Sequence, residues 1–372
     1  FFPRLPAVGA SHYEIRIVEG AREPEDVPPP ALNHDLDHST GLITSLYAGE
    51  GSEFLNGSLL RALVVDDDGD SWGADRWSYR NVLGQFETVP GSVQVLQRGP
   101  IRTITEAMFA WGTSTLAMRT ISYPEWPVLE FRLRVQWNET RKRLKLSIPT
   151  ALQTDQILCE VPGGAMPRPS DGQEYVQARW AFLSGSIGGR PAGFGVVNSG
   201  QHGFDLNHGE IRLSVLRSAA YCHEQGFKIG EFPLRKYMDQ GVHDVRLLVT
   251  AGNLDTVRRS LSGLADWRSS PPAVYTHLPI GTRRKKSVKG AAGEMPLSLL
   301  SLEPTSVRMM ACMPSADGRR MIVRLQETVG ERTKVLLTLH QPLKKIALKF
   351  DPFEMKTLQI KRNGGWKEVE MV

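Results

Sequence analysis

Strict alternation of apolar and polar residues over Leu129–Trp137 constrains the fold of this chain more than any other feature. In the stretch VLEFRLRVQW, an apolar residue stands at every second position from Leu129 to Trp137, with charged or amide residues between. Successive side chains of a β-strand point to opposite faces, so this spacing gives one apolar and one polar face. That pattern is typical of an antiparallel sheet that covers a core with one of its faces.

Similar strand patterns recur along most of the chain, for example in EIRLSVLR, HDVRLLVT and KVLLTLH. Only Asn253–Trp267 has apolar residues at helical spacing. Thirty-five glycines and twenty-four prolines suit the many turns that such strands need. The sequence therefore predicts an all-β chain, built as a sandwich rather than as an α/β fold.

Two segments of distinct composition predict the domain boundaries. AREPEDVPPPA is a charged, proline-rich connector, and RRKKSVKGAAGEMP is a basic segment rich in small residues. We therefore expect an entry strand and connector (1–29), a large β-domain (30–283), a basic linker (284–296) and a small C-terminal β-sandwich (297–372). A chain of 372 residues is long enough for such a division.

The net charge of +5 is concentrated in the stretch TRRKKSVKG, Thr282–Gly290. The aromatic residues lie mostly elsewhere, whereas nucleic-acid surfaces interleave cations with stacking aromatics. We interpret the run as a solvated linker and expect no nucleic-acid partner. No apolar stretch approaches the roughly 20 residues of a membrane span, so no membrane partner is expected either.

Cysteine usage favours a reducing compartment, here the cytoplasm of a bacterium. Cys159, Cys222 and Cys312 are far apart and odd in number, which suits neither a disulfide framework nor a zinc cage. Two glycosylation sequons, at Asn56 and Asn138, are weak evidence for the opposite.

The stretch NHDLDHSTG, Asn33–Gly41, holds residue types that bind zinc. In a helix, His34 and His38 would share a face. In a strand, both histidines face away from Asp35 and Asp37, and the four cannot converge on one ion. A proline cluster before the stretch and the turn signal STG at its end favour the strand, so we expect no metal here.

Several stretches, in order from about Gly9 to Ile360, resemble the C-terminal portion of glycoside hydrolase family 38, the α-mannosidases. The most recognisable is GFGVVNSGQHGFDLNHGEIRLSVLRSAAY, and VVDDDGDSWGADRWSY and EVPGGAMPRPSDGQEYVQARWAFLSG are similar to other parts of that region. The resemblance implies a supersandwich like that of galactose mutarotase, followed by a small β-sandwich.

The resemblance also implies a retaining α-mannosidase whose Asp nucleophile, acid/base carboxylate and zinc all lie in an N-terminal catalytic barrel upstream of this chain. No catalytic residue and no metal ligand are then expected here, and zinc belongs to the missing domain. The implied partners are that catalytic domain and a mannose-containing oligosaccharide, and a homo-oligomer is left open.

Residues expected to line the carbohydrate cleft begin with Asp70, Trp72, Asp75 and Trp77. Tryptophans stack on pyranose rings, and carboxylates accept hydrogen bonds from sugar hydroxyls. The competing interpretation is a solvated acidic loop with packed tryptophans. Many bacterial members of the family carry a Trp-Asp-Ala-Trp run where this chain reads WGADRW, which leaves the substrate preference open.

Arg217, Asp239 and His243 are further cleft candidates. Arg217 follows a predicted strand and is as readily a sheet-edge arginine. The run DQGVH from Asp239 to His243 resembles a loop of the family near its cleft, although a turn with a structural histidine explains it as well.

We therefore expect a non-catalytic part of an α-mannosidase that is inactive when alone. Two other functions stay open on the sequence. One is a stand-alone carbohydrate-binding module, and the other is a mutarotase- or epimerase-like enzyme with a histidine base and an acidic partner.

Overall fold

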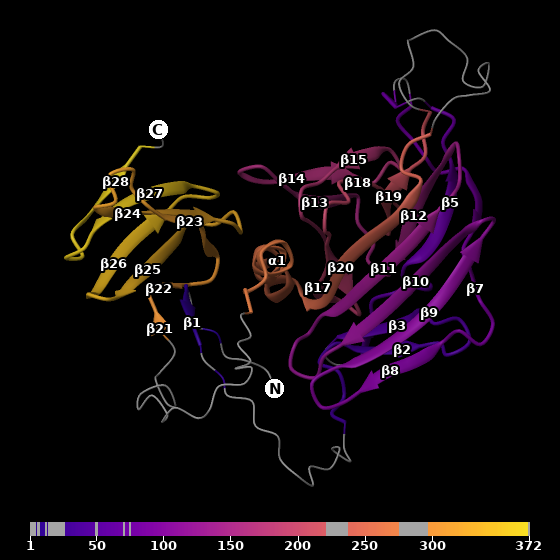
Figure 1. The fold of residues 1–372 in the computed structure, drawn as a ribbon, viewed down its shortest axis with the longest axis horizontal. Coiled ribbons are helices and arrows are strands. Elements are labelled where there is room, and N and C mark those ends of the chain that lie inside the picture. Colours follow the sequence, from indigo (N-terminus) through magenta and orange to yellow (C-terminus); the bar gives the residue numbers. More distant parts are fainter. Residues whose placement is uncertain are drawn as a thin grey trace, which may run out of the picture. The chain divides into compact units, whose positions relative to one another are not determined.

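The computed structural model describes residues 5, 8–11, 13, 27–48, 51–69, 71–73, 76–220, 237–274 and 297–370 (Figure 1). Antiparallel strands make up most of this part, and it contains one helix. The predicted all-β class is confirmed. The chain divides into two compact units, residues 23–269 and residues 1–22 together with 270–372. No helix in the described part is long and apolar enough to cross a bilayer.

A ten-stranded sheet forms one layer of the larger unit, in the order β14-β13-β16-β17-β20-β11-β10-β9-β7, with β8 also paired to β9. Its strands are β7 (Glu87–Thr88), β8 (Gln94–Arg98), β9 (Thr103–Trp111), β10 (Ser114–Ser122), β11 (Leu129–Trp137), β13 (Gln156–Val161), β14 (Gly164–Pro169), β16 (Trp180–Ile187), β17 (Arg190–Val197) and β20 (Gly241–Asn253). The strand β14 at one edge contains Pro167 and Pro169.

A six-stranded sheet forms a second layer, in the order β15-β18-β19-β12-β5-β6. Its strands are β5 (Arg61–Asp66), β6 (Val82–Gln85), β12 (Lys142–Pro149), β15 (Glu174–Val176), β18 (Gly203–Asn207) and β19 (Glu210–Arg217). A three-stranded sheet of β2 (Asn33–Leu36), β3 (Ile43–Ala48) and β4 (Ser52–Glu53) completes the unit.

The core of the larger unit lies between the facing sheets. The apolar side chains of β11 that the alternation predicted as buried are at most 2% exposed, and they share one cluster with Leu144, Leu146 and Ile148 of β12. Trp137 at the end of β11 is fully buried, and its indole Nε1–H donates to Ser218 Oγ at 3.0 Å. Burial of this apolar area is the main favourable term in folding.

The helix α1 (Leu254–Ser269) packs on β16, β17 and β20 through Val257, Leu261 and Leu264. It begins one residue after the predicted start, because Asn253 serves as its cap. The Asn253 side-chain oxygen accepts hydrogen bonds from the backbone N–H groups of Asp255 and Thr256.

The strand interpretation of NHDLDHSTG is confirmed, since β2 and β3 flank a turn over residues 38–40. The Asp37 carboxylate accepts hydrogen bonds from Ser39 and Thr40 in this turn, which lower the pKa of Asp37. Burial lowers the pKa of His34, whose Nδ1–H donates to the Leu32 carbonyl oxygen. Asp37 thus holds the turn, and His34 is engaged with the backbone before β2.

The smaller unit is a separate sandwich with its own core, which includes Val323, Leu337 and Leu358. One sheet contains β22 (Leu300–Glu303), β25 (Thr333–His340) and β26 (Leu343–Phe350), and the other contains β23 (Val307–Pro314), β24 (Arg320–Glu327), β27 (Met355–Lys361) and β28 (Trp366–Val369). A short strand, β1 (Gly9–Ala10), pairs with β21 (Leu297–Ser298). The predicted basic linker lies outside the described residues, as do residues 14–26 of the predicted entry strand and connector.

Gly41→Ala tests how tightly the first hairpin packs on the large sheet. Gly41 has a φ of +71°, and a methyl group there would lie 2.3 Å from Ala107 Cβ. Gly91 has a similar φ of +74° but no atom within 4 Å of the same position. We expect Gly91→Ala to cost about 1–2 kcal/mol of unfolding free energy for the left-handed backbone, and Gly41→Ala to cost about 1–3 kcal/mol more for overpacking. Urea unfolding of both variants measures the difference, and equal losses would contradict the packing argument.

Candidate functional site

The second face of the six-stranded sheet carries charged side chains where a core would carry apolar ones. Along β12, Leu144 and Leu146 face the core, whereas Arg143 and Lys145 alternate with them and point to the other face. Lys145 is nevertheless completely buried and Arg143 is 7% exposed. Buried charges need partners, so this face must supply acids.

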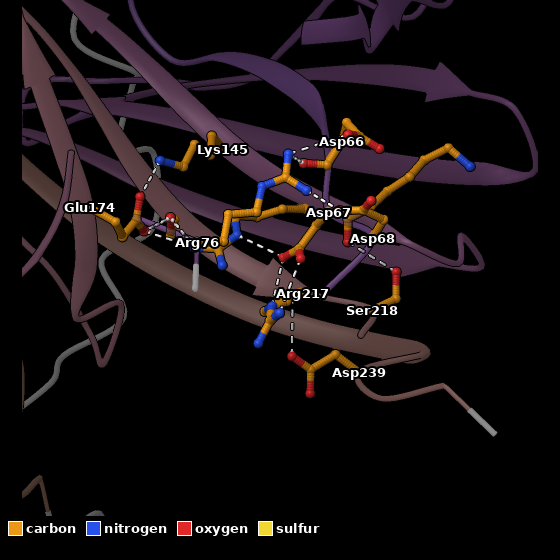
Figure 2. Close-up of polar contacts among 12 residues, drawn as sticks. Asp66, Asp67, Asp68, Arg76, Lys145, Glu174, Arg217, Ser218 and Asp239 are labelled. Atoms are coloured by element: carbon orange, nitrogen blue, oxygen red, sulfur yellow. Dashed lines mark hydrogen bonds and ion pairs between the residues drawn. The ribbon is translucent and has the colours of Figure 1, made fainter. Parts of the chain in front are cut away.

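Asp67, directly after β5, is the acid at the centre of one half of this face. Its carboxylate is fully buried and accepts hydrogen bonds from Arg143 Nε at 3.1 Å and from Arg217 Nε at 2.6 Å and Nη2 at 3.0 Å (Figure 2). The contact with Arg217 is bidentate, the strongest geometry for this kind of pair. One carboxylate thus holds two guanidinium groups from β12 and β19.

The aromatic ring of Tyr79 covers this ion cluster. Its centroid lies 3.5 Å from the Arg143 guanidinium carbon and 5.1 Å from that of Arg76. Burial raises the pKa of Tyr79. Arg76 also pairs with Asp66 and Asp68, so both ends of the segment 66–79 are tied to the sheet.

Two further acids, Glu174 and Asp205, neutralise Lys145. Its ammonium group contacts Glu174 Oε2 and Asp205 Oδ2, each at 2.5 Å, and Arg143 Nη1 reaches Glu174 Oε1 at 2.8 Å. Arg80 completes the contacts of Asp205. Burial raises the pKa of Asp205, and the Lys145 ammonium opposes that rise. The cluster therefore runs without a break from Arg217 to Asp205 across four strands.

Three of the predicted cleft residues lie together at one end of the cluster. The Asp239 carboxylate accepts the backbone N–H of Arg217 at 3.2 Å (Figure 2). His243 Nε2–H donates to the Asp239 carbonyl oxygen at 2.7 Å, so this ring nitrogen is used within the turn. Arg217 Nη1 also lies 3.5 Å from the carbonyl oxygen of Ser71, which precedes Trp72.

The two predicted tryptophans are strongly exposed. Trp72 is 76% and Trp77 72% exposed. Asp67, which precedes both, pairs with Arg217, and Arg76, which lies between them in the sequence, pairs with Asp66. The Trp77 carbonyl oxygen accepts the backbone N–H of Glu174 at 2.7 Å, which ties Trp77 to β15. Both tryptophans thus present apolar surface to solvent. Asp70 and Asp75 lie outside the described residues.

The sequence reasoning missed the buried part of this cluster. The acids and bases that hold it are Asp67, Tyr79, Arg80, Arg143, Lys145, Glu174 and Asp205. One signal was available, because RLKLSIP alternates Arg143 and Lys145 with three apolar residues. An alternating strand is normally taken to have a wet face, and nothing in the sequence shows that a distant segment covers it.

Among the described residues, no group of three or more histidine, cysteine or acidic side chains is placed to hold a metal ion. The acids of the cluster each contact arginine or lysine instead. His34 and Asp35 occupy successive positions of β2 and point to opposite faces.

The sequence model described as "Glycosyl hydrolases family 38 C-terminal domain" matches residues 30–225, just over half of the chain. The chain belongs to glycosyl hydrolase family 38. Residues 30–225 include the charged sheet face, both exposed tryptophans and Arg217.

This family 38 domain is similar to parts of three proteins that are named α-mannosidases. It is 25% identical over 180 residues to alpha-mannosidase G of Dictyostelium discoideum, covering 44% of this chain and 16% of that protein. It is 25% identical over 192 residues to mouse alpha-mannosidase 2C1, covering 48% and 18%. The crystal structure of an α-mannosidase from Enterococcus faecalis V583 matches with a TM-score of 0.68 at 13% identity, covering 91% of this chain and 43% of that one.

The similarity to the Enterococcus structure shows that the two proteins share a fold over most of this chain. At 13% identity it shows nothing about activity or ligands. The chain spans less than a fifth of the curated relatives and less than half of the solved structure.

Asp67→Asn tests whether the ion cluster holds the site. The substitution keeps the shape but removes the charge that pairs with both Arg143 and Arg217, so we expect a loss of about 3–5 kcal/mol in unfolding free energy. Asp68→Asn, in an exposed pair with Arg76, serves as the control and should cost about 0–1 kcal/mol. Urea unfolding compares them, and similar losses would show that the buried pairs contribute little.

Proposed function

We propose that this chain is the non-catalytic β-portion of a family 38 α-mannosidase and that the surface around Trp72 and Trp77 faces the carbohydrate. The observation that carries the proposal is the exposure of both indoles, close in the sequence to the buried carboxylate of Asp67. The N–H of Glu174 holds the backbone at Trp77, which lowers the conformational entropy that Trp77 loses when a ligand binds.

The chemistry of this surface suits a sugar. Pyranose rings stack on indole faces, and their hydroxyls take hydrogen bonds from charged groups nearby. Arg217 and Asp239 provide such groups at the Trp72 end. The proposed ligand is the mannose-containing substrate of the whole enzyme, and the proposed partner is the catalytic portion that binds it from the other side.

Catalysis is proposed to reside outside this chain. Retaining glycosidases need two carboxylates about 5 Å apart that both reach the sugar. Asp67, Glu174 and Asp205 are instead paired with arginine or lysine beneath the surface, and the Nε2 of His243 donates to a backbone carbonyl. The zinc ion that the family resemblance implies has no fitting ligand set among the described residues, and we propose that the catalytic portion holds it.

The purified 372-residue chain is expected to show no turnover of an aryl α-mannoside, with or without added zinc. Enzymes of this kind supply rate enhancements of roughly 10⁶-fold or more through catalytic groups that we propose lie outside this chain. The full-length protein from the same reading frame is the positive control. Turnover by the chain within a factor of ten of that control would refute the proposal and support a hydrolytic site built around Asp70, Asp75 or His243.

Titration with methyl α-mannoside should move the indole Nε1–H signals of Trp72 and Trp77 in the NMR spectrum. Trp366 is 40% exposed in the smaller unit and serves as the internal control, with no expected shift. Trp72→Ala and Trp77→Ala assign the signals. A signal shift confined to Trp366, or no shift at millimolar sugar, would refute the proposed carbohydrate role of this surface. Submillimolar affinity would instead favour a stand-alone binding module.

A further inference from the structure

The smaller unit contains a hollow that the proposed function does not use. Its volume is about 390 Å³, and it opens where β23 and β27 end and β24 begins. Leu339, Ile360 and Met321 form an apolar floor. Leu339 and Ile360 are only 3% and 2% exposed, so the hollow reaches down to the core of the sandwich.

Four cationic residues surround this floor, namely Arg319, Arg320, Lys361 and Arg362. All four are exposed, and none makes an ion pair with a carboxylate in the described part of the chain. Asp317 lies in the same turn, where its carboxylate accepts hydrogen bonds from Ser315 Oγ and from the backbone N–H of Arg319, and its charge also attracts that of Arg320. The rim therefore carries an excess of positive charge, unlike the paired arginines of the larger unit.

The strand register makes this charge costly. Arg320 and Lys361 are direct partners across β24 and β27. Like charges directly opposite each other on neighbouring strands destabilise a sheet. Arg320 Nη1 donates to Gln359 at 3.1 Å, a neutral contact that leaves the repulsion in place. An anion held between the two side chains would remove that cost.

We propose that this hollow binds a soluble amphiphilic anion, with its carboxylate, phosphate or sulfate on the cationic rim and its apolar part on the floor. The volume lies within the roughly 300–1,000 Å³ of small-molecule sites. A nucleic acid would need stacking aromatics, and the residues that line the hollow include none. A neutral sugar carries no charge that could neutralise the four cations.

Calorimetric titration of the 372-residue chain with octyl phosphate tests the proposal. Inorganic phosphate provides the charge without the tail, and octyl glucoside provides the tail without the charge. We expect octyl phosphate to bind at least tenfold more tightly than either. Affinity for inorganic phosphate equal to that for octyl phosphate would overturn the role of the apolar floor.

A double variant locates the binding. Arg320→Gln with Lys361→Gln should weaken octyl phosphate binding at least tenfold. The matched control is Lys334→Gln with Lys349→Gln, because these lysines also face each other, across β25 and β26, and do not line the hollow. The control should bind as the unchanged chain does, and equal losses in both variants would overturn the site.

Two further measurements complete the test. Octyl phosphate should slow alkylation of Cys312, which lines the hollow, in a chain carrying Cys222→Ser, since Cys159 is buried. Thermal unfolding shows whether each variant is folded. Binding to phosphatidylglycerol vesicles without binding of monomeric octyl phosphate would assign the cations to a membrane surface and overturn the pocket.

Discussion

The desolvated carboxylate of Asp67 is the interaction on which the candidate site depends. It lies between two guanidinium groups from different strands, and the segment that follows it carries both exposed tryptophans. Burying a charge is unfavourable by itself, so this arrangement is stable only when every partner is present. The sheet face is thereby a rigid support, in which a change below the surface alters the position of groups above it.

The cluster also explains how a sandwich keeps a second buried face with only a small apolar cluster, formed by Leu63, Val65 and Tyr79. β12 has apolar side chains toward the main core and Arg143 and Lys145 toward the other side, with Tyr79 stacked on Arg143. These ion pairs restrict how the segment that covers the sheet face can lie, because each buried cation must contact an acid. A purely apolar face would tolerate more than one placement.

The sequence predicted the parts of the structure that local pattern controls. The alternation in β11, the helix near residues 254–269 and the hairpin at NHDLDHSTG all follow from side-chain period and turn residues. It did not predict the pairing of Asp67 with Arg217, since these lie 150 residues apart and meet only through strand order. Trp72 and Trp77 were chosen by residue type, and their exposure depends on which segment covers which sheet.

The prolines of β14 bear on how the large sheet ends. An edge strand presents unpaired backbone groups to solvent, and another chain can add to it as a new strand. Two of the six residues of β14, Pro167 and Pro169, have no N–H to offer an incoming strand. Strand addition at this margin would leave acceptors on the newcomer unsatisfied. The prolines thus disfavour edge-to-edge aggregation at this side of the ten-stranded sheet. This protection matters most when newly synthesised chains are present at high local concentration.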